Sequence, residues 1–592
     1  MNVNNKISKL RKLMDEKGID AYIIPTYDAH QSEYVGEHWQ SRVWISGFTG
    51  SAGTVVVTKD EAGLWTDGRY FIQAENQLKG SEIKLFKMGI PGYPTYIEWI
   101  KDNLEKGETL GFDGKVFPQS DVESMSEELS NKGIKFVEEY DLIDEIWTDR
   151  PELPMDEIFI HDAKYTGKTP EEKLEDVRKE MKKLEVEYYI LGSLDDIAWV
   201  YNVRGKDVKY NPVVTSYAFI SMDKAYLFIH KTKVPEEVEE FLNENGIEIR
   251  EYEEVRNYVE NIEKGSRVFI DPSKVNRWLY NGIPKECKVV GGTNITTNLK
   301  AIKNSVEIKN LKNSYVKDGV ALVKFLYWLD KNLGKTTISE ISVADKLEEF
   351  RSEQEDFVEP SFATIAAYKD HAPMMHYSAT EDSDYTLEKE GMLLIDSGGQ
   401  YLDGTTDITR TIILGPITEE EKKDFTLTLK GHINLIKARF LYGATGSNLD
   451  VLARFPLWQE GIDYKCGTGH GVGFFLNVHE GPHRFAPIPN KVRLEEGMVI
   501  TIEPGVYKEG KHGIRIENDI VVRKDIVTES GQFMKFETIS YCPIDLEGVD
   551  VELLDEDERQ WLNNYHSEVY EKLSPYLNED EKEWLKNETR NI

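Results

Sequence analysis

At 592 residues the chain is too long for one hydrophobic core, and its length predicts three or four domains. Hydrophobic residues make up 40% of the chain and charged residues 30%, which is the composition of an ordinary soluble globular protein. The formal net charge of −34 argues against nucleic acid as a partner, because binding to a phosphate backbone needs a surplus of Lys and Arg.

The cysteines and the N-terminal segment bear on the compartment. Cys287, Cys466 and Cys542 are too few and too widely separated for a disulfide framework, so we expect a reducing compartment. The N-terminal segment carries charges at helical spacing where a secretory signal would need an apolar stretch. No stretch approaches the roughly 20 apolar residues of a membrane span. We therefore expect a cytoplasmic protein that does not bind membranes.

Residues 1–152 are predicted to form a first α/β domain. An amphipathic helix, with Ile7, Leu10 and Met14 on one face, precedes the strand A-Y-I-I-P. A strand-rich section follows, with T-V-V-V-T and the turn W-T-D-G-R-Y. The segment at 148–156, T-D-R-P-E-L-P-M-D, interrupts the pattern with prolines and is predicted to be a linker.

Residues 153–303 are predicted to repeat that plan. A charged helix leads to the strand Y-Y-I-L and then to D-I-A-W-V-Y-N-V-R-G at 196–205. This run is similar to R-V-W-I-S-G-F-T-G at 42–50, since each is apolar and aromatic, ends in glycine and is followed by β-rich segments. We infer two tandem copies of one α/β domain whose sequence identity is weak.

Residues 304–592 are predicted to form a third domain with a helical tail. A long amphipathic helix should open the domain, because apolar residues such as Leu311 and Tyr315 recur at helical spacing. The acidic tail, about 549–592, is rich in aromatic residues such as Trp561, and we expect it to dock against another surface.

Two carboxylates come together within residues 391–411, G-M-L-L-I-D-S-G-G-Q-Y-L-D-G-T-T-D-I-T-R-T. β-rich runs flank a glycine-rich turn, which predicts a β-hairpin carrying Asp396 in its first strand and Asp407 in its second. Alternation places Asp407 and Thr409 on the face opposite Ile408. Carboxylates at such a hairpin are costly unless something compensates them, and a cation is the obvious candidate. Exposed carboxylates on a wet loop are the alternative.

Further polar residues close or interrupt apolar strands in the C-terminal half. His470 lies in the glycine-rich loop G-T-G-H-G-V-G, and His479 follows in N-V-H-E-G-P. Glu503 ends the strand M-V-I-T-I-E, and Arg515 and Glu517 share one face of the predicted strand G-I-R-I-E-N-D-I-V-V. Two Asp, two Glu and one His so placed form a ligand set for two divalent cations. Oxygen-dominated sites with one imidazole suit Mn²⁺, Co²⁺, Fe²⁺ or Zn²⁺.

The order Asp, Asp, His, Glu, Glu with these flanking motifs resembles the pita-bread metallopeptidases, and among them the three-domain Xaa-Pro aminopeptidases, or aminopeptidases P. The resemblance implies an α/β fold of two tandem creatinase/prolidase-like N-terminal domains followed by a C-terminal pita-bread catalytic domain with a helical extension. It also implies a homodimer formed through the catalytic domains. It covers nearly the whole chain, because further matching motifs are W-I-S-G-F-T-G-S-A-G-T (44–54), L-W-T-D-G-R-Y-F-I-Q-A (64–74), D-I-A-W-V-Y-N-V-R-G (196–205) and W-L-N-N-Y-H (561–566).

The resemblance assigns a role to each candidate ligand. Asp407 and Glu517 would bridge the two cations, Asp396 would bind one of them, and His470 and Glu503 would bind the other. Two cations about 3.5–4 Å apart can share a water and lower its pKa towards neutrality. Glu503 would take the proton from that water and pass it to the leaving imino nitrogen.

Four residues are expected to contact the substrate, and they are Arg69, His376, His470 and His479. His376 precedes Asp396 by the spacing that the family shows for a substrate-contacting histidine. His479 would donate a hydrogen bond to the scissile carbonyl or the developing oxyanion. Either residue could instead be a loop histidine whose hydrogen bonds are satisfied within the protein and that does not contact the substrate. Arg69 matches a position that reaches the substrate site, and its alternative is a turn arginine paired with Asp67. The predicted catalytic residues are His376, His479 and Glu503.

One position departs from the family pattern. Many relatives have a histidine four residues before the ligand histidine, where this chain has Cys466. A Cys-x-x-x-His spacing could indicate a soft-metal site, but the other candidate ligands are oxygens. We expect Cys466 to be a small buried neighbour of the site.

The predicted function is that of a cytoplasmic dinuclear-metal aminopeptidase. It would hydrolyse the N-terminal Xaa-Pro bond of peptides with proline in second position, through a metal-bridging hydroxide. The expected cofactors are two divalent cations per subunit, Mn²⁺ in the first place and Co²⁺ or Zn²⁺ otherwise. One alternative is prolidase, which cuts Xaa-Pro dipeptides on the same fold but generally has one N-terminal domain. Another is a non-catalytic pita-bread protein that binds peptides, although such proteins typically lose metal ligands.

Overall fold

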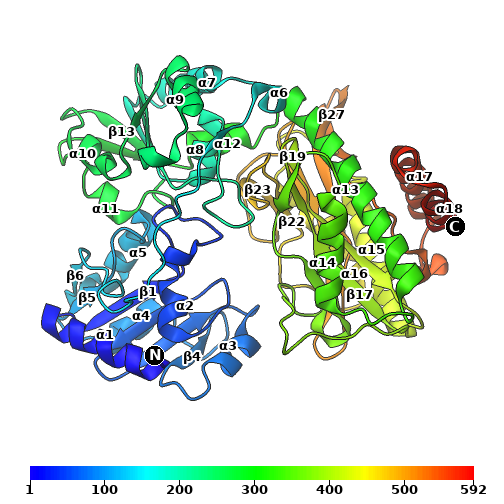
Figure 1. Cartoon of the computed structure of the whole chain (residues 1–592), viewed down its shortest axis with the longest axis horizontal. Coiled ribbons are helices and arrows are strands. Elements are labelled where there is room, and N and C mark those ends of the chain that lie inside the picture. The colour runs from blue at the N-terminus through cyan, green and yellow to red at the C-terminus, as the bar shows by residue number, and fades with distance from the viewer. The chain divides into compact units, whose positions relative to one another are not determined.

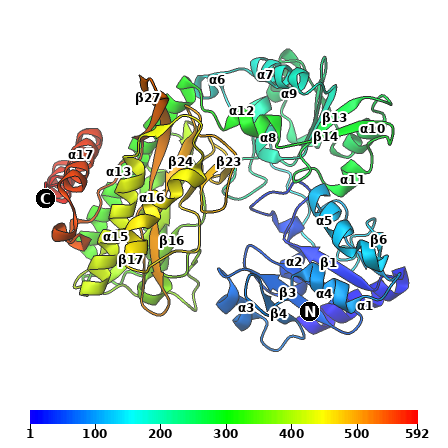
Figure 2. The same cartoon turned by 180° about the vertical axis from the view of Figure 1, so that it is seen from behind.

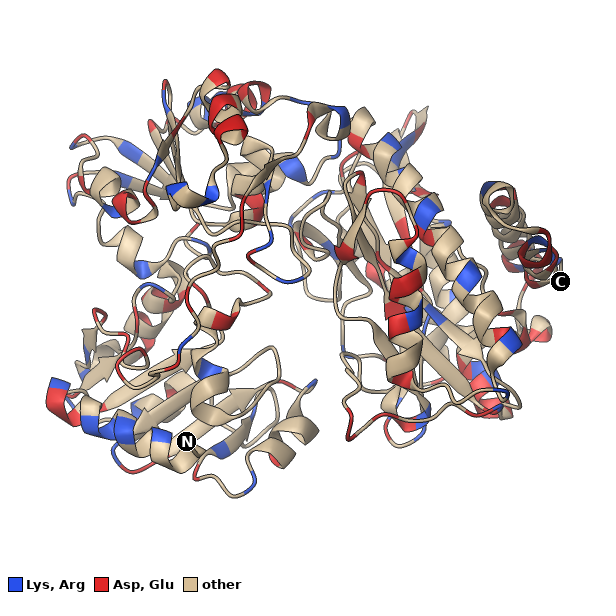
Figure 3. Ribbon diagram, in the orientation of Figure 1, with Lys and Arg blue, Asp and Glu red and all other residues tan.

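The computed structural model describes residues 1–592, and the chain divides into two compact units. None of its helices combines the length and the apolar character that a membrane crossing demands. Both units carry Lys and Arg as well as Asp and Glu on their helices (Figure 3). The first unit comprises Met1–Ile160, Lys168–Lys209 and Val213–Thr296, and the second comprises His161–Gly167, Tyr210–Pro212 and Thr297–Ile592.

Two six-stranded sheets form the core of the first unit (Figure 1). The first sheet contains β1 (Ala21–Pro25), β2 (Thr54–Thr58), β3 (Ala62–Thr66), β4 (Lys84–Lys87), β5 (Thr109–Gly111) and β6 (Lys135–Val137). The second contains β8 (Tyr188–Leu191), β10 (Tyr217–Ser221), β11 (Ala225–Phe228), β12 (Ile247–Arg250), β13 (Arg267–Ile270) and β14 (Lys288–Gly291), and a separate short pair joins β7 (Phe159–Ile160) to β9 (Val203–Arg204).

The two sheets have the same topology. Their strand orders are β4-β3-β2-β1-β5-β6 and β12-β11-β10-β8-β13-β14. The central strand of each, β1 or β8, has an antiparallel neighbour on one side and a parallel neighbour on the other. The matching order and directions confirm the predicted tandem copies of one α/β domain.

Local sequence signals fix where the helices of this unit begin. The first helix, Val3–Lys17, buries Ile7, Leu10 and Met14 as its spacing predicted, and ends at Gly18 with a φ of 70°. The helix Pro170–Lys183 is preceded by Thr169, whose side chain completes a capping box. The helices of this unit are α1 (Val3–Lys17), α2 (Ser41–Ser46), α3 (Phe71–Gln77), α4 (Tyr96–Asn103), α5 (Gln119–Leu129), α7 (Pro170–Lys183), α8 (Leu194–Tyr201), α9 (Glu236–Glu244), α10 (Val255–Glu260) and α11 (Arg277–Tyr280), and α12 (Ile295–Lys300) runs from it into the second unit.

The second unit combines several sheets with long helices. Its strands are β15 (Phe357–Pro360), β16 (Ile365–Tyr368), β17 (Met392–Ser397), β18 (Gly399–Tyr401), β19 (Gly404–Thr405), β20 (Ile408–Ile413), β21 (Phe440–Leu441), β22 (Gly469–Gly471), β23 (Glu480–Phe485), β24 (Val499–Ile502), β25 (Gly505–Lys508), β26 (His512–Arg515), β27 (Asn518–Thr528) and β28 (Gly531–Thr538). Its helices are α6 (Ala163–Thr166), α13 (Ser305–Asn332), α14 (Glu340–Ser352), α15 (Glu419–Ile436), α16 (Gly446–Gln459), α17 (Glu556–Leu573) and α18 (Glu579–Glu588).

The sheets of the second unit are covered by α13, α15 and α16 (Figures 1 and 2). One sheet has the order β16-β17-β20, and the largest has the order β21-β28-β27-β24-β22-β23. The main apolar core joins α13, α15, β27 and α17 through residues such as Leu311, Phe425, Val521 and Leu562. Removal of these side chains from water supplies the main stabilisation of the unit.

The long helix α13 and the C-terminal tail follow the prediction. The Asn304 side chain accepts hydrogen bonds from the first turn of α13, so the helix begins at Ser305. In the tail, α17 buries Leu562 and Tyr565 against the core, which confirms that the aromatic tail docks. The domain boundaries at residues 152 and 303 stay predictions.

Candidate metal centre

A hairpin delivers the two aspartates, as predicted. β17 and β20 are antiparallel, Asp396 lies in β17 opposite Thr409, and Asp407 directly precedes β20. The connection between β17 and β20 is longer than a simple turn, because it contains β18 and β19. These two strands pair with each other, and β18 also pairs with β15, in a separate sheet. Ile395 and Ile408 pack into an apolar core. The carboxylates therefore project from the opposite face of a buried sheet.

His470 lies in a strand, so the prediction of a glycine loop was wrong. It is the middle residue of β22, which pairs with β23 and contacts β24 through Gly471. A Cβ atom at Gly469 would collide with the carbonyl oxygen of Thr501, so glycine is needed for this close approach. The His470 Nδ1 atom lies 2.9 Å from the carbonyl oxygen of Gly471. Donation from Nδ1 to that oxygen leaves the Nε2 lone pair available for a metal.

The two glutamates flank strand breaks. Glu503 connects β24 to β25, and its backbone N–H donates to the carbonyl of Thr468 at 2.8 Å. Glu517 lies between β26 and β27, which belong to different sheets. The prediction of one continuous strand through Arg515 and Glu517 was therefore wrong. The predicted common face was right, because both side chains contact the Thr409 hydroxyl.

The structure gathers the five predicted ligands into one cluster. Ligand atoms of Asp407, His470 and Glu517 all lie within 4.8 Å of one another. The His470 Nε2 atom is 3.5 Å from Asp407 Oδ2 and 3.6 Å from Glu503 Oε1. Asp396 is an electrostatic neighbour of the same carboxylates, and its Oδ1 atom is buried without a hydrogen-bond partner. This donor set could hold two divalent cations.

The electrostatics of the cluster call for positive charge. Burial first, and then the Asp396 and Glu503 carboxylates, raise the pKa of Asp407 well above its usual value. Burial, Asp407 and Glu503 likewise raise the pKa of Glu517. Burial is also the main cause that raises the pKa of Glu503 to about 7. Bound divalent cations would offset this desolvation and repulsion and keep the carboxylates ionised.

Arg515 is the guanidinium that faces the cluster. It donates to Asp396 Oδ2 at 2.5 Å, to the Thr409 hydroxyl at 3.1 Å and to the Tyr507 hydroxyl at 2.8 Å. Arg515 therefore braces the Asp396 carboxylate. Sequence reasoning missed Thr409 and Tyr507 as parts of the site. The only signal for Thr409 was its position on the same strand face as Asp407.

The remaining candidates lie in different settings. The His479 ring is 4.3 Å from the His470 ring, edge to face, directly before β23. His376 lies in an exposed turn between β16 and β17. Arg69, in the first unit, forms two hydrogen bonds of 2.8 Å with the Asp67 carboxylate. The substrate roles of these three side chains stay predictions.

Cys466 is a neighbour of the cluster. Burial first, and then the Glu503 carboxylate, raise the pKa of its thiol to about 12. Because the metal-binding form of cysteine is the thiolate, this environment disfavours the soft-metal alternative. The Cys466 backbone carbonyl accepts a hydrogen bond of 2.7 Å from buried Arg454, which fixes the segment before β22.

Comparison with known proteins assigns families to most of the chain. Residues 6–146 and 149–307 each match the creatinase/prolidase N-terminal domain, residues 309–524 match metallopeptidase family M24, and residues 532–592 match the C-terminal region of that family. Aminopeptidase P2 of Arabidopsis thaliana is 41% identical over 97% of this chain and 86% of its own length. Xaa-Pro aminopeptidase 1 of Dictyostelium discoideum is 40% identical over 97% of this chain and 94% of its own length.

Solved structures agree with these matches. An X-prolyl aminopeptidase from Caenorhabditis elegans, described as a cytosolic enzyme with a dinuclear active site, superposes with a TM-score of 0.95 at 37% identity over 100% of both chains. The prolidase of Thermococcus sibiricus, 22% identical, shares the fold over 64% of this chain and 98% of its own, with a TM-score of 0.51. The predicted fold class, two creatinase-like domains followed by a pita-bread domain, is confirmed. The chain therefore belongs to the M24 metallopeptidases, in the family of the Xaa-Pro aminopeptidases, and is an enzyme of that family.

Proposed function

We propose that the chain removes the N-terminal residue from peptides whose second residue is proline. The observation that carries this proposal is the cluster of buried carboxylates around His470, set in a chain that resembles Xaa-Pro aminopeptidases along its whole length. The cofactors would be two divalent cations, with Mn²⁺ as the first candidate, because the donor set is mainly oxygen with one imidazole. Metal analysis of the purified protein, together with an assay on an Xaa-Pro-Pro peptide, tests both statements.

Each candidate ligand has a proposed place. Asp407 and Glu517 would bridge the two cations, which their mutual proximity beside His470 supports. Asp396 would bind one cation and would be held in place by Arg515. His470 and Glu503 would bind the other, which the 3.6 Å separation of their ligand atoms supports.

The protein side chains would supply the proton transfers and the oxyanion contact. When bound, divalent cations would lower the pKa of water and so supply the hydroxide nucleophile. Glu503, whose pKa of about 7 suits proton transfer near neutrality, would take the proton and deliver it to the leaving imino nitrogen. His479 would donate a hydrogen bond to the carbonyl oxygen as negative charge develops on it. His376 would contact the substrate from its exposed turn.

The substrate must present a free α-amino group and a chain that runs on past proline. Asp396 is the proposed anchor for the ammonium group, since its Oδ1 atom has no hydrogen-bond partner. Arg69 is the proposed contact further along the peptide. Prolidase activity is the alternative, because prolidase must instead recognise the carboxylate that directly follows proline. Two tandem N-terminal domains favour the aminopeptidase.

The assembly and the compartment are also proposals. We place the enzyme in the cytoplasm, as its free cysteines and the description of the Caenorhabditis elegans relative support. A homodimer through the second unit is supported by an apolar stripe on α16. Val451, Phe455 and Trp458 recur there at helical spacing and are 41%, 55% and 47% exposed.

Replacement of Asp407 by Asn should abolish peptidase activity with little loss of stability. The amide cannot bridge two cations, whereas the packing of Ile408 and its neighbours is unchanged. Metal content by elemental analysis should fall in step with turnover. Asp382→Asn, at an exposed loop position, is the matched control and should behave as the parent. Turnover by Asp407→Asn with two bound metals would show that Asp407 is not a bridge.

Removal of the metals should reverse the pH dependence of stability in the acid range. Without cations, the pKa values of Glu503, Asp407 and Glu517 are higher in the folded than in the unfolded chain, so the folded state binds more protons. Their stabilising contribution is complete below the unfolded value of about 4.3 and is lost as pH rises through the folded values, which for Glu503 is about 7.

Denaturant unfolding of the chelator-treated protein should therefore show a free energy of unfolding that is lower at pH 7.5 than at pH 5, by an amount on the order of a few kcal/mol. Readdition of Mn²⁺ should remove this difference, because the cations hold the carboxylates ionised. If the free energy of unfolding depended on pH equally with and without metal, the proposed ligand cluster would be contradicted.

His479→Ala should lower kcat by roughly 10²–10³, the usual cost of removing an oxyanion donor, with metal content unchanged. His479→Gln keeps an N–H donor and should recover part of the rate. Steady-state kinetics with parallel metal analysis separates the outcomes. A loss of metal in His479→Ala would mean that His479 is a ligand.

An Xaa-Pro-Pro peptide amide should be cleaved at least as fast as the corresponding Xaa-Pro dipeptide. The proposed site anchors an ammonium group and requires no carboxylate after proline. Acetylation of the N-terminus should abolish cleavage, because the ammonium contact and the register it sets are both lost. Chromatographic detection of the released residue measures each rate. Cleavage of the dipeptide alone would reassign the chain as a prolidase.

A further inference from the structure

A cavity lies within the second unit, apart from the metal centre. It has a volume of about 260 Å³ and is bounded by α13, β20, the segment that follows β28, and α18. None of the five candidate metal ligands lines it. Its size is near the lower end for sites that hold small ligands.

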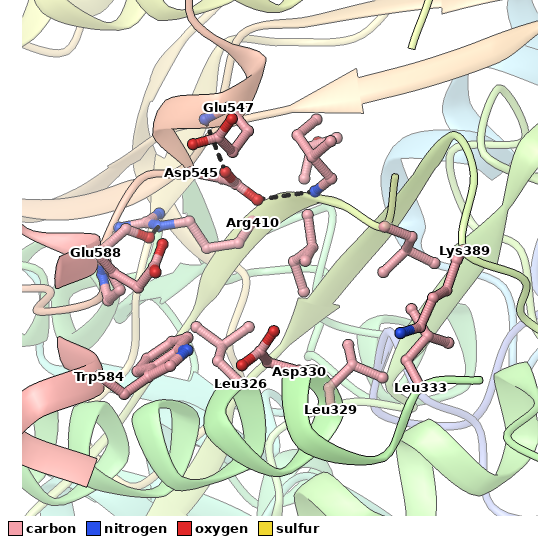
Figure 4. Close-up of a pocket in the computed structure, with 15 residues that line it drawn as sticks. Leu326, Leu329, Asp330, Leu333, Lys389, Arg410, Asp545, Glu547, Trp584 and Glu588 are labelled. Carbon is pink, nitrogen blue, oxygen red and sulfur yellow. Dashed lines mark hydrogen bonds between the residues drawn. The ribbon is translucent and has the colours of Figure 1, made fainter. Parts of the chain in front are cut away.

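One wall of this cavity is apolar and aromatic. Leu326, Leu329 and Leu333 project into it from successive turns of α13, and Trp584 closes it from α18 (Figure 4). The indole ring of Trp584 also packs edge to face on Tyr327, at 6.3 Å between centroids, which fixes its orientation. These groups suit a ligand with an apolar body, and an indole face additionally attracts cations.

Two carboxylates line the cavity without a salt bridge, although the Arg590 guanidinium is an electrostatic neighbour of one of them, Glu588. Asp545 accepts hydrogen bonds from the backbone N–H groups of Ile413 and Glu547, and Glu588 accepts one from the Asn587 side chain. Neither carboxylate forms a salt bridge. The two other acidic lining residues are already paired, Glu547 with Arg590 and Asp330 with Lys331.

The positive charges of the lining do not neutralise this pair. The Arg410 guanidinium is 4% exposed and donates to carbonyl oxygens and to the Asn518 and Tyr565 side chains. Lys389 lies at the other end of the cavity from Glu588 and Trp584, beside Leu333 (Figure 4). The Glu588 end is therefore acidic.

Burial and neighbouring carboxylates raise the proton affinity of both groups. Burial, and then the Glu588 and Glu547 carboxylates, raise the pKa of Asp545 to about 6, against the backbone hydrogen bonds that lower it. Burial, and then Asp330 and Glu547, raise the pKa of Glu588, against the Asn587 hydrogen bond and the Arg590 charge that lower it. A bound cation would relieve this repulsion.

We propose that this cavity binds an organic cation, an ammonium or guanidinium group carried on an apolar aliphatic or aromatic body. The charged group lies between Glu588, Asp545 and the face of Trp584, and the body lies along the α13 leucines. Such a ligand meets the cavity with both complementary charge and complementary apolar surface.

The test uses phenethylammonium as the cation and phenethyl alcohol as its neutral counterpart. Isothermal titration calorimetry on the full-length, metal-loaded protein should show saturable binding of the cation, and at least about tenfold weaker binding of the alcohol, since charge-assisted hydrogen bonds are lost. Glu588→Gln should weaken binding of the cation by a similar factor. Trp584→Leu should also weaken this binding.

Matched variants keep the outcome interpretable. Glu583→Gln removes a negative charge from an exposed position of the same helix and should bind as the parent does. Unchanged thermal unfolding and peptidase turnover would show that Glu588→Gln is folded. Should it fail to fold, Asp545→Asn, which removes the charge of the other carboxylate without a salt bridge, should still weaken binding of the cation. Equal binding of cation and alcohol, unweakened binding by the cavity variants, or no binding by the parent would overturn the proposal.

Discussion

Repulsion among four clustered carboxylates, three buried and one, Glu503, half-buried, is the interaction that the second unit must offset. Burial removes the hydration of Asp407 and Glu517 and raises the pKa of both, and the neighbouring carboxylates of the cluster raise these pKa values further. Arg515 contributes one compensating charge, through its contact with Asp396. One guanidinium cannot balance four carboxylates, so a requirement for bound cations is built into the arrangement. The need of this anionic cluster for bound cations agrees with the membership of the chain in a metallopeptidase family.

The backbone that carries these carboxylates is held by a second arginine. Arg410 lies on β20 and donates to the backbone carbonyl of Glu517 at 2.5 Å and to the Asn518 side chain at 2.8 Å. It joins the hairpin that bears Asp407 to the strand break that bears Glu517. The metal centre therefore has one arginine at its face and another behind it.

Sequence reasoning found the candidate ligands because each interrupts a strand in a recognisable motif. It could not find the break between β26 and β27, since alternation reports the face of a residue and not its partner strand. It assigned His470 to a loop because glycines dominate the segment. In the structure this segment is a strand, in which Gly469 lies close to the backbone of Thr501, a residue that is distant in the sequence. Thr409 and Arg410 were missed for the same reason, as their contacts with Glu517 span more than a hundred residues.

The C-terminal extension belongs to this same network. The Tyr565 hydroxyl, on α17, accepts a hydrogen bond from Arg410 and contacts the carbonyl of Cys542. Tyr565 is 5% exposed, so its hydroxyl forms hydrogen bonds with Arg410 and other protein groups in place of water. Without α17, Arg410 would lose a partner and the core would lose Leu562. The extension is therefore part of the scaffold that positions Glu517, and the tail aromatics that seemed suited to a separate partner are used within the chain itself.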